Sequence, residues 1–166
     1  MSAAVVVFAI GNPSRGDDAL GPILLARLAA WLAERDFEND FELIEDFQLQ
    51  IEHALDLAGR RLALFIDAGI RTPAPYRFFP IEPAERLAHT THALSPESVL
   101  EVFQRTEGDV PPPAFVLCVR GESFELGEAL SPAATQAADA AFGLLTRLCR
   151  QPDLAVWQHE SQCDLV

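Results

Sequence analysis

The stretch that decides the fold is AVVVFAIGNPSRGDDALG, residues 4–21. Its first part, Ala4 to Ile10, is an uninterrupted apolar run rich in β-branched residues. Such a run is typical of a strand that is covered on both faces of a parallel sheet. A Gly-Asn-Pro turn follows, and then two adjacent carboxylates, Asp17 and Asp18, stand where apolar residues begin to recur at helical spacing. The stretch therefore predicts a buried strand, an acidic loop and a helix.

A role as helix cap explains only one of the two acids, because one carboxylate is enough to cap a helix and to interact favourably with its dipole. One of the pair can cap the helix while the other projects into a crevice. A nucleotide-binding loop is excluded. GNPSRG lacks the middle glycine of GxGxxG, no GK[ST] follows, and the two acids would repel a pyrophosphate.

Strand and helix patterns alternate along the chain, which predicts a three-layer α/β/α sandwich with right-handed crossovers. The sheet has about five strands and is mostly parallel. The segment PYRFFPIE is separated from the preceding strand by too few residues for a crossover helix, so we expect it to be an antiparallel edge strand. The other strands are expected at 4–10, 41–47, 61–69 and 114–121, and the helices at 17–35, 49–59, 95–106 and 131–151.

We expect residues 1–151 to form a single domain. After Pro152 no strong periodicity remains, so residues 152–166 are expected to be a peripheral tail. Ser95 and Ser131, each followed by proline, are expected N-caps of the last two helices.

In open α/β sheets, ligands bind beyond the carboxyl ends of the strands. This rule selects the acidic loop after the first strand and Asp67, which ends the third strand within LFIDAG. A role of Asp67 in a loop or cap is the alternative. His89 and His92 lie just before a helix, His53 is expected to pack or to lie on the surface, and His159 lies in the tail. Carboxylates with a histidine would suit a first-row divalent metal better than magnesium or calcium.

The charge, the length of the apolar runs and the cysteine pattern exclude several classes of function. The chain of 166 residues has 12 basic and 25 acidic residues and a formal net charge of -13, which disfavours binding to nucleic acids or to anionic membranes. The N-terminus does not read as a signal peptide and no apolar run reaches the length of a membrane helix, so a cytoplasmic protein is expected. The three cysteines form no CxxC pair, and no GxSxG elbow is present.

Four segments together resemble the hydrogenase maturation endopeptidases: GNPSRGDDALGP, DFQLQIEHALDL, LFIDAG and HALSPESVL. The resemblance covers roughly residues 4–149, and the GN…DD…G spacing of the first motif is its most specific part. The DFQLQIEHAL segment departs from the commoner version of the family, which has a glycine-rich turn there. It resembles a subgroup associated with soluble, NAD-linked hydrogenases.

The resemblance implies an aspartyl-type endopeptidase that removes a C-terminal extension from the large-subunit precursor of a nickel-iron hydrogenase. Motif by motif, Asp18, Asp67 and His92 become both the catalytic and the metal-binding residues, and Asp17 becomes the helix cap. The nickel would come with the precursor, so no permanent cofactor is expected. The sequence does not prove that His92 rather than His89 is the ligand, but the spacing to the following helix favours His92. The alternatives are a metal-carrying hydrolase of small peptides or amides and a nickel-sensing chaperone.

Overall fold

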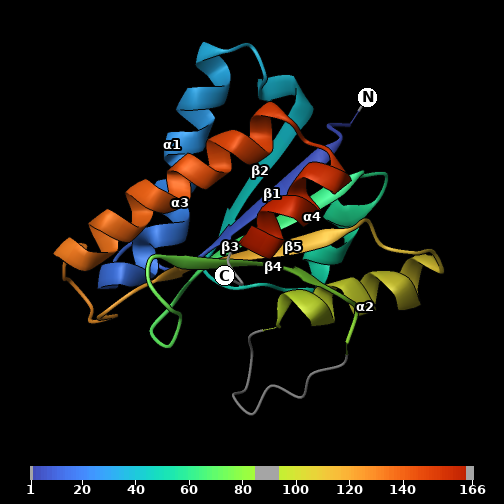
Figure 1. The fold of residues 1–166 in the computed structure, drawn as a ribbon. Coiled ribbons are helices and arrows are strands. Elements are labelled where there is room, and N and C mark those ends of the chain that lie inside the picture. Colours follow the sequence, from blue (N-terminus) through green and yellow to red (C-terminus); the bar gives the residue numbers. More distant parts are fainter. Residues whose placement is uncertain (1, 85–93, 164–166) are drawn as a thin grey trace.

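The computed structural model describes residues 2–84 and 94–163, which contain a five-stranded sheet with the order β2-β1-β3-β5-β4. Four of the strands are parallel, and β4 pairs antiparallel with β5 at one edge (Figure 1). The predicted α/β/α fold with an antiparallel edge strand is confirmed. The strands are β1 Val5–Ile10, β2 Phe41–Asp46, β3 Leu62–Gly69, β4 Tyr76–Ile81 and β5 Ala114–Arg120.

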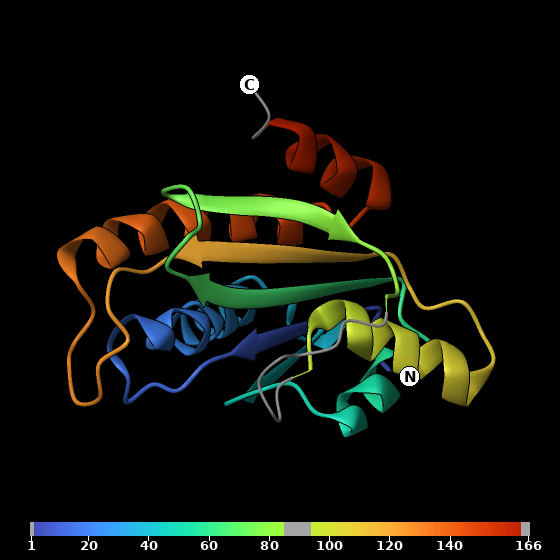
Figure 2. The same ribbon diagram turned by 90° about the horizontal axis from the view of Figure 1, so that it is seen from below.

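Helices cover both faces of the sheet, as Figures 1 and 2 show from two sides. On one face lie α1 and α3, and on the other face α2 lies beside the 3-10 helix η3. Two further 3-10 helices, η1 and η2, precede α1 and β2. The bounds are η1 Gly16–Ala19, α1 Leu20–Glu34, η2 Glu38–Asp40, η3 Ile51–Leu57, α2 Pro96–Glu107, α3 Pro132–Arg150 and α4 Leu154–Gln162.

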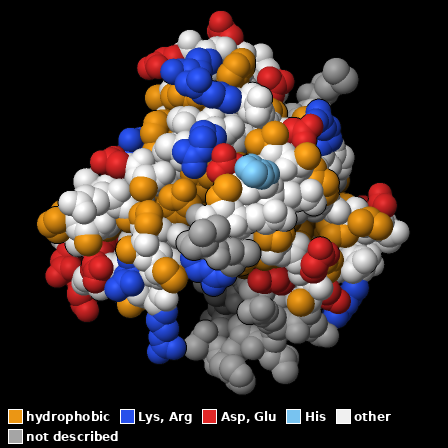
Figure 3. All heavy atoms as spheres, in the orientation of Figure 1, with side chains coloured by type: hydrophobic (Ala, Val, Ile, Leu, Met, Phe, Trp, Pro, Cys, Tyr) orange, Lys and Arg blue, Asp and Glu red, His pale blue; other side chains and the backbone are white. Residues whose placement is uncertain are grey.

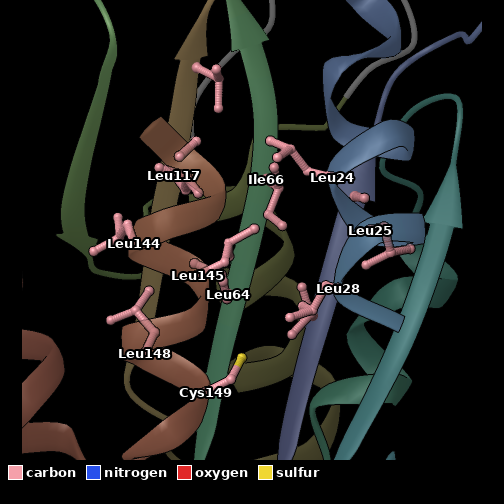
Figure 4. Close-up of a cluster of buried hydrophobic side chains, with 14 of the residues drawn as sticks. Leu24, Leu25, Leu28, Leu64, Ile66, Leu117, Leu144, Leu145, Leu148 and Cys149 are labelled. Carbon is pink, nitrogen blue, oxygen red and sulfur yellow. The ribbon is translucent and has the colours of Figure 1, made fainter. Parts of the chain in front are cut away.

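The core has one part on each face of the sheet. The alternation of side chains along β1 and β3 sends successive residues to opposite faces, and both faces are buried. Figure 4 shows the part under α1 and α3, where leucines from both helices meet apolar side chains of β3 and β5. The opposite part is built mainly from Phe8, Leu57, Phe65, Leu100 and Phe103.

Both predicted Ser-Pro helix starts are confirmed. The Ser95 hydroxyl accepts a hydrogen bond from the Ser98 amide at 3.1 Å, and the Ser131 hydroxyl accepts one from the Ala134 amide at 3.1 Å. The prolines follow directly and occupy the first helical position, where no amide hydrogen is needed.

The expected second helix at 49–59 is shorter than the pattern predicts and has 3-10 geometry, over Ile51–Leu57. The 3-10 repeat of three residues buries Ala54 and Leu57 against the sheet. A capping box starts it, in which the Gln50 amide donates to His53 Nδ1 at 2.8 Å. Of the two alternatives for His53, packing or a surface position, the structure shows packing, because the side chain is buried edge-on to the Phe8 ring.

The region after Pro152 contains a helix, α4, that the sequence pattern does not indicate. Trp157 is fully buried, with its ring edge-on to Phe78 and Phe115 and its Nε1 donating to the Leu148 carbonyl at 3.0 Å. One buried side chain therefore attaches α4 to the core beside β4, in the region where a peripheral tail was expected.

On the face of Figure 3, basic and acidic side chains are interspersed with hydrophobic ones. None of the helices in residues 2–84 and 94–163 combines the length and the apolar character that a membrane crossing requires.

Candidate active site

The loop that follows β1 holds Asp18 at the carboxyl edge of the sheet. The Asn12 amide donates to Asp18 Oδ2 at 2.8 Å, and the Gly11 amide donates to the Asp46 carbonyl of the neighbouring strand. Gly11 has a φ of +149°, and a Cβ at this position would collide with the Asp18 carbonyl oxygen. Only glycine allows the loop to turn this closely over the carboxylate.

Asp67 stands near the carboxyl end of β3, where five buried residues precede it. Its Oδ1 accepts a hydrogen bond from the Ala68 amide at 2.8 Å. Burial raises the pKa of Asp67 to about 7, the Ala68 bond opposes this rise, and the charge of Asp18 adds to it. The two carboxylates thus interact electrostatically, and Asp67 is easily protonated near neutral pH.

Asp18 and Asp67 line one pocket of about 460 Å³. It lies beyond the carboxyl ends of β1 and β3, where the strand-end rule places ligands. Apart from the two carboxylates, its lining is mostly apolar, so a ligand there would be partly shielded from water. The other lining residues are Ile10, Phe47, Gln48, Leu49, Phe65, Leu94, Ser95 and Pro96.

His89 and His92 fall in residues 85–93, outside the described part of the chain, so the predicted role of His92 stays a prediction. The other two histidines do not reach the pocket lining: His53 Nε2 lies 3.4 Å from Asp46 Oδ2, and His159 belongs to α4. Within residues 2–84 and 94–163, no group of three His, Cys, Asp or Glu side chains could hold a metal ion.

Asp17 does not cap α1, so this expectation was wrong. Its side chain is fully buried and accepts four hydrogen bonds from the segment after β5: from the amides of Glu122 (2.7 Å), Ser123 (3.2 Å) and Ser131 (2.8 Å) and from the Ser131 hydroxyl (2.8 Å). Burial alone would raise the pKa of Asp17, but the hydrogen bonds outweigh it and the pKa is lowered. Asp17 is therefore an ionised anchor that faces away from the pocket.

The two adjacent acids have separate roles, because their side chains contact different parts of the protein. Asp17 binds the loop between β5 and α3, and Asp18 faces the pocket. The sequence pattern also missed the contribution of Phe47, Gln48 and Leu49 to the lining. Their only signal was the DFQLQ segment in the family resemblance.

The two carboxylates suit a cation chemically. A divalent ion between Asp18 and Asp67 would replace the proton that Asp67 takes up near pH 7 and would relieve their repulsion. Two carboxylate side chains from the described residues leave much of the coordination shell of a first-row metal open to other ligands.

The chain was compared with family models, curated proteins and solved structures. No family model matches, and no curated protein matches. A [NiFe] hydrogenase maturation protease, HycI from Thermococcus kodakarensis KOD1, superimposes with a TM-score of 0.66 at 23% identity, over 90% of this chain and 94% of that one. The hydrogenase maturating endopeptidase HybD from E. coli gives 0.66 at 21% identity, over 89% and 93%.

The solution structure of the endopeptidase HycI from Escherichia coli gives a TM-score of 0.63 at 18% identity, over 87% of this chain and 90% of that one. These alignments span nearly all of both partners, so they compare whole domains. The chain therefore has the fold of the hydrogenase maturation proteases.

Proposed function

We propose that the protein is an endopeptidase that removes the C-terminal extension from the large-subunit precursor of a [NiFe] hydrogenase. The observation that carries this proposal is the pairing of Asp18 and Asp67 in one pocket, at the carboxyl edge of a sheet whose fold is that of maturation proteases. The sequence motifs that resemble this family include both acids.

Nickel belongs to the substrate in this proposal. The ion is already seated in the precursor, and Asp18, Asp67 and His92 complete its coordination when the precursor docks. An open site with few protein donors suits this role, because it binds an ion weakly until the precursor supplies the remaining ligands. The scissile bond is then held next to the two carboxylates. The enzyme needs no permanent cofactor.

His92 is supported by its position in the chain. Leu94 and Ser95 line the pocket, and His92 precedes Leu94 by only two residues in the sequence. His89 is three residues further away. The acidic net charge argues against nucleic acid and membrane as partners, and we place the reaction in the cytoplasm.

The test offers the enzyme the same folded precursor with and without nickel and follows removal of the extension by a gel shift. We expect cleavage of the nickel-loaded form only. Asp18→Asn and His92→Ala should each abolish cleavage with unchanged far-UV circular dichroism, and His89→Ala should retain it as the matched control. Equal cleavage of both precursor forms would refute nickel-dependent recognition. A stoichiometric metal in the purified enzyme would instead favour a metal-carrying hydrolase.

A further inference from the structure

Three large apolar side chains are exposed on the segment between β2 and β3. Phe47, Ile51 and Leu55 keep 63%, 63% and 64% of their surface accessible. We call these three residues the apolar patch. Single exposed apolar residues are ordinary, but three on one short segment mark a candidate contact surface.

The backbone holds the patch in this outward orientation. The segment begins with the Phe47 amide donating to Asp46 Oδ1 at 2.7 Å, and η3 is attached to the sheet by buried Ala54 and Leu57. Leu55 directly follows Ala54 and lies on the outer side of η3, and Ile51 is exposed at the first residue of the helix. The exposure of Leu55 therefore follows from how η3 is attached to the sheet.

The apolar patch is continuous with the candidate active site. Phe47 belongs both to the patch and to the lining of the pocket that contains Asp18 and Asp67. A partner with one chain segment in the pocket would therefore meet the patch next.

The segment that carries the patch is acidic. Residues 41–57 contain five Asp or Glu residues and no Lys or Arg. Glu52 is exposed on η3 between the two patch residues of that helix, and it has no ion-pair partner among the residues that the structure describes. Arg60 pairs with Glu42 and so does not neutralise Glu52. The complementary surface would carry apolar side chains bordered by Lys or Arg.

We infer that the apolar patch is the docking surface for the precursor beside the segment that is cleaved, and that it contacts an apolar, basic-rimmed region of the large subunit. This inference rests on the proposed function, which supplies the identity of the partner. It adds that recognition uses a protein–protein contact outside the pocket in addition to the metal. Burying Ile51 and Leu55 on docking would supply binding energy outside the pocket that holds the scissile bond.

The experiment measures steady-state cleavage of the nickel-loaded precursor by the wild type, Phe47→Ser, Leu55→Ser and Val110→Ser. Val110 is the matched control because it is 78% exposed and lies in the connection before β5, outside both the patch and the pocket lining. We expect KM to rise at least about tenfold in each patch variant, with kcat near the wild-type value in Leu55→Ser, whose side chain lies outside the pocket lining. The Val110→Ser variant should match the wild type. Glu52→Gln should raise KM at low salt and weaken its dependence on salt.

The outcomes separate the two proposals. If the wild type cleaves the nickel-loaded precursor and KM is unchanged in both patch variants, the docking proposal is overturned and the proposed function stands. If the wild type fails to cleave the nickel-loaded precursor, both fall. Analytical ultracentrifugation adds a further check: a wild-type dimer that Phe47→Ser and Leu55→Ser dissociate would assign the patch to self-association and overturn docking of the precursor.

Discussion

Replacing Asp67 with asparagine should make the protein more stable above neutral pH while it abolishes activity. Asparagine has nearly the shape of a protonated aspartate, and its Oδ1 can still accept the Ala68 amide. It cannot ionise, so it removes both the burial of a charge and the repulsion by Asp18 that raise the pKa of Asp67.

The magnitude follows from the pKa. The folded-state pKa of about 7 lies above the ordinary value of 3.8, so the folded protein binds more protons than the unfolded chain between these values. The free energy of unfolding contributed by this group is therefore fully present below about pH 4 and is lost as the pH rises through 7. A difference of about 3 pH units corresponds to at most about 4 kcal/mol.

Urea unfolding of the wild type and of Asp67→Asn at several pH values between about 4 and 8 measures this effect. The other titrating groups are common to both proteins, so the difference between the two unfolding free energies isolates Asp67. We expect the variant to gain stability relative to the wild type by roughly 2–4 kcal/mol across this range. If the difference in unfolding free energy between the two proteins does not change with pH, the claim that ionised Asp67 destabilises the folded protein is refuted.

Two further predictions concern the fold. Asp17→Asn should lower the free energy of unfolding by about 3 kcal/mol in urea titrations, because the amide offers one acceptor oxygen to four donors and leaves buried amides unsatisfied. A free energy of unfolding within about 0.5 kcal/mol of the wild-type value would contradict the anchoring role. Trp157→Ala should lose about 4 kcal/mol by the same measurement, because it opens a cavity beside Phe78 and Phe115, whereas Leu154→Ala, at a partly exposed position of α4, should lose much less.

Local patterns in the sequence predicted most of the fold. The apolar runs of β1, β3 and β5 and the Ser-Pro starts of α2 and α3 depend on neighbours in the sequence, so their pattern was sufficient. The edge position of β4 followed from the short connection that precedes it. The strand-end rule selected the positions of Asp18 and Asp67, and both side chains line the same pocket.

The features that the sequence did not predict depend on distant contacts. Helix α4 is placed by one tryptophan that packs edge-on against two stacked aromatic rings of the sheet, which leaves no periodic signal. The 3-10 geometry of η3 follows from packing against the sheet, so an apolar pattern alone could not distinguish it from an α-helix. The role of Asp17 depends on donors that follow it by 105, 106 and 114 residues.

The hydrogen bonds of Asp17 also determine when, during synthesis of the chain, the loop with Asp18 can adopt its final structure. A ribosome that has released β1, α1, β2 and β3 has already exposed both acids, but the amides that bind Asp17 belong to residues synthesised only after β5. The loop that carries Asp18 therefore cannot acquire its final support until the start of α3 emerges. A nascent chain or fragment that ends before Ser131 would carry both acidic residues without the anchored loop, which delays the complete site until most of the protein has been made.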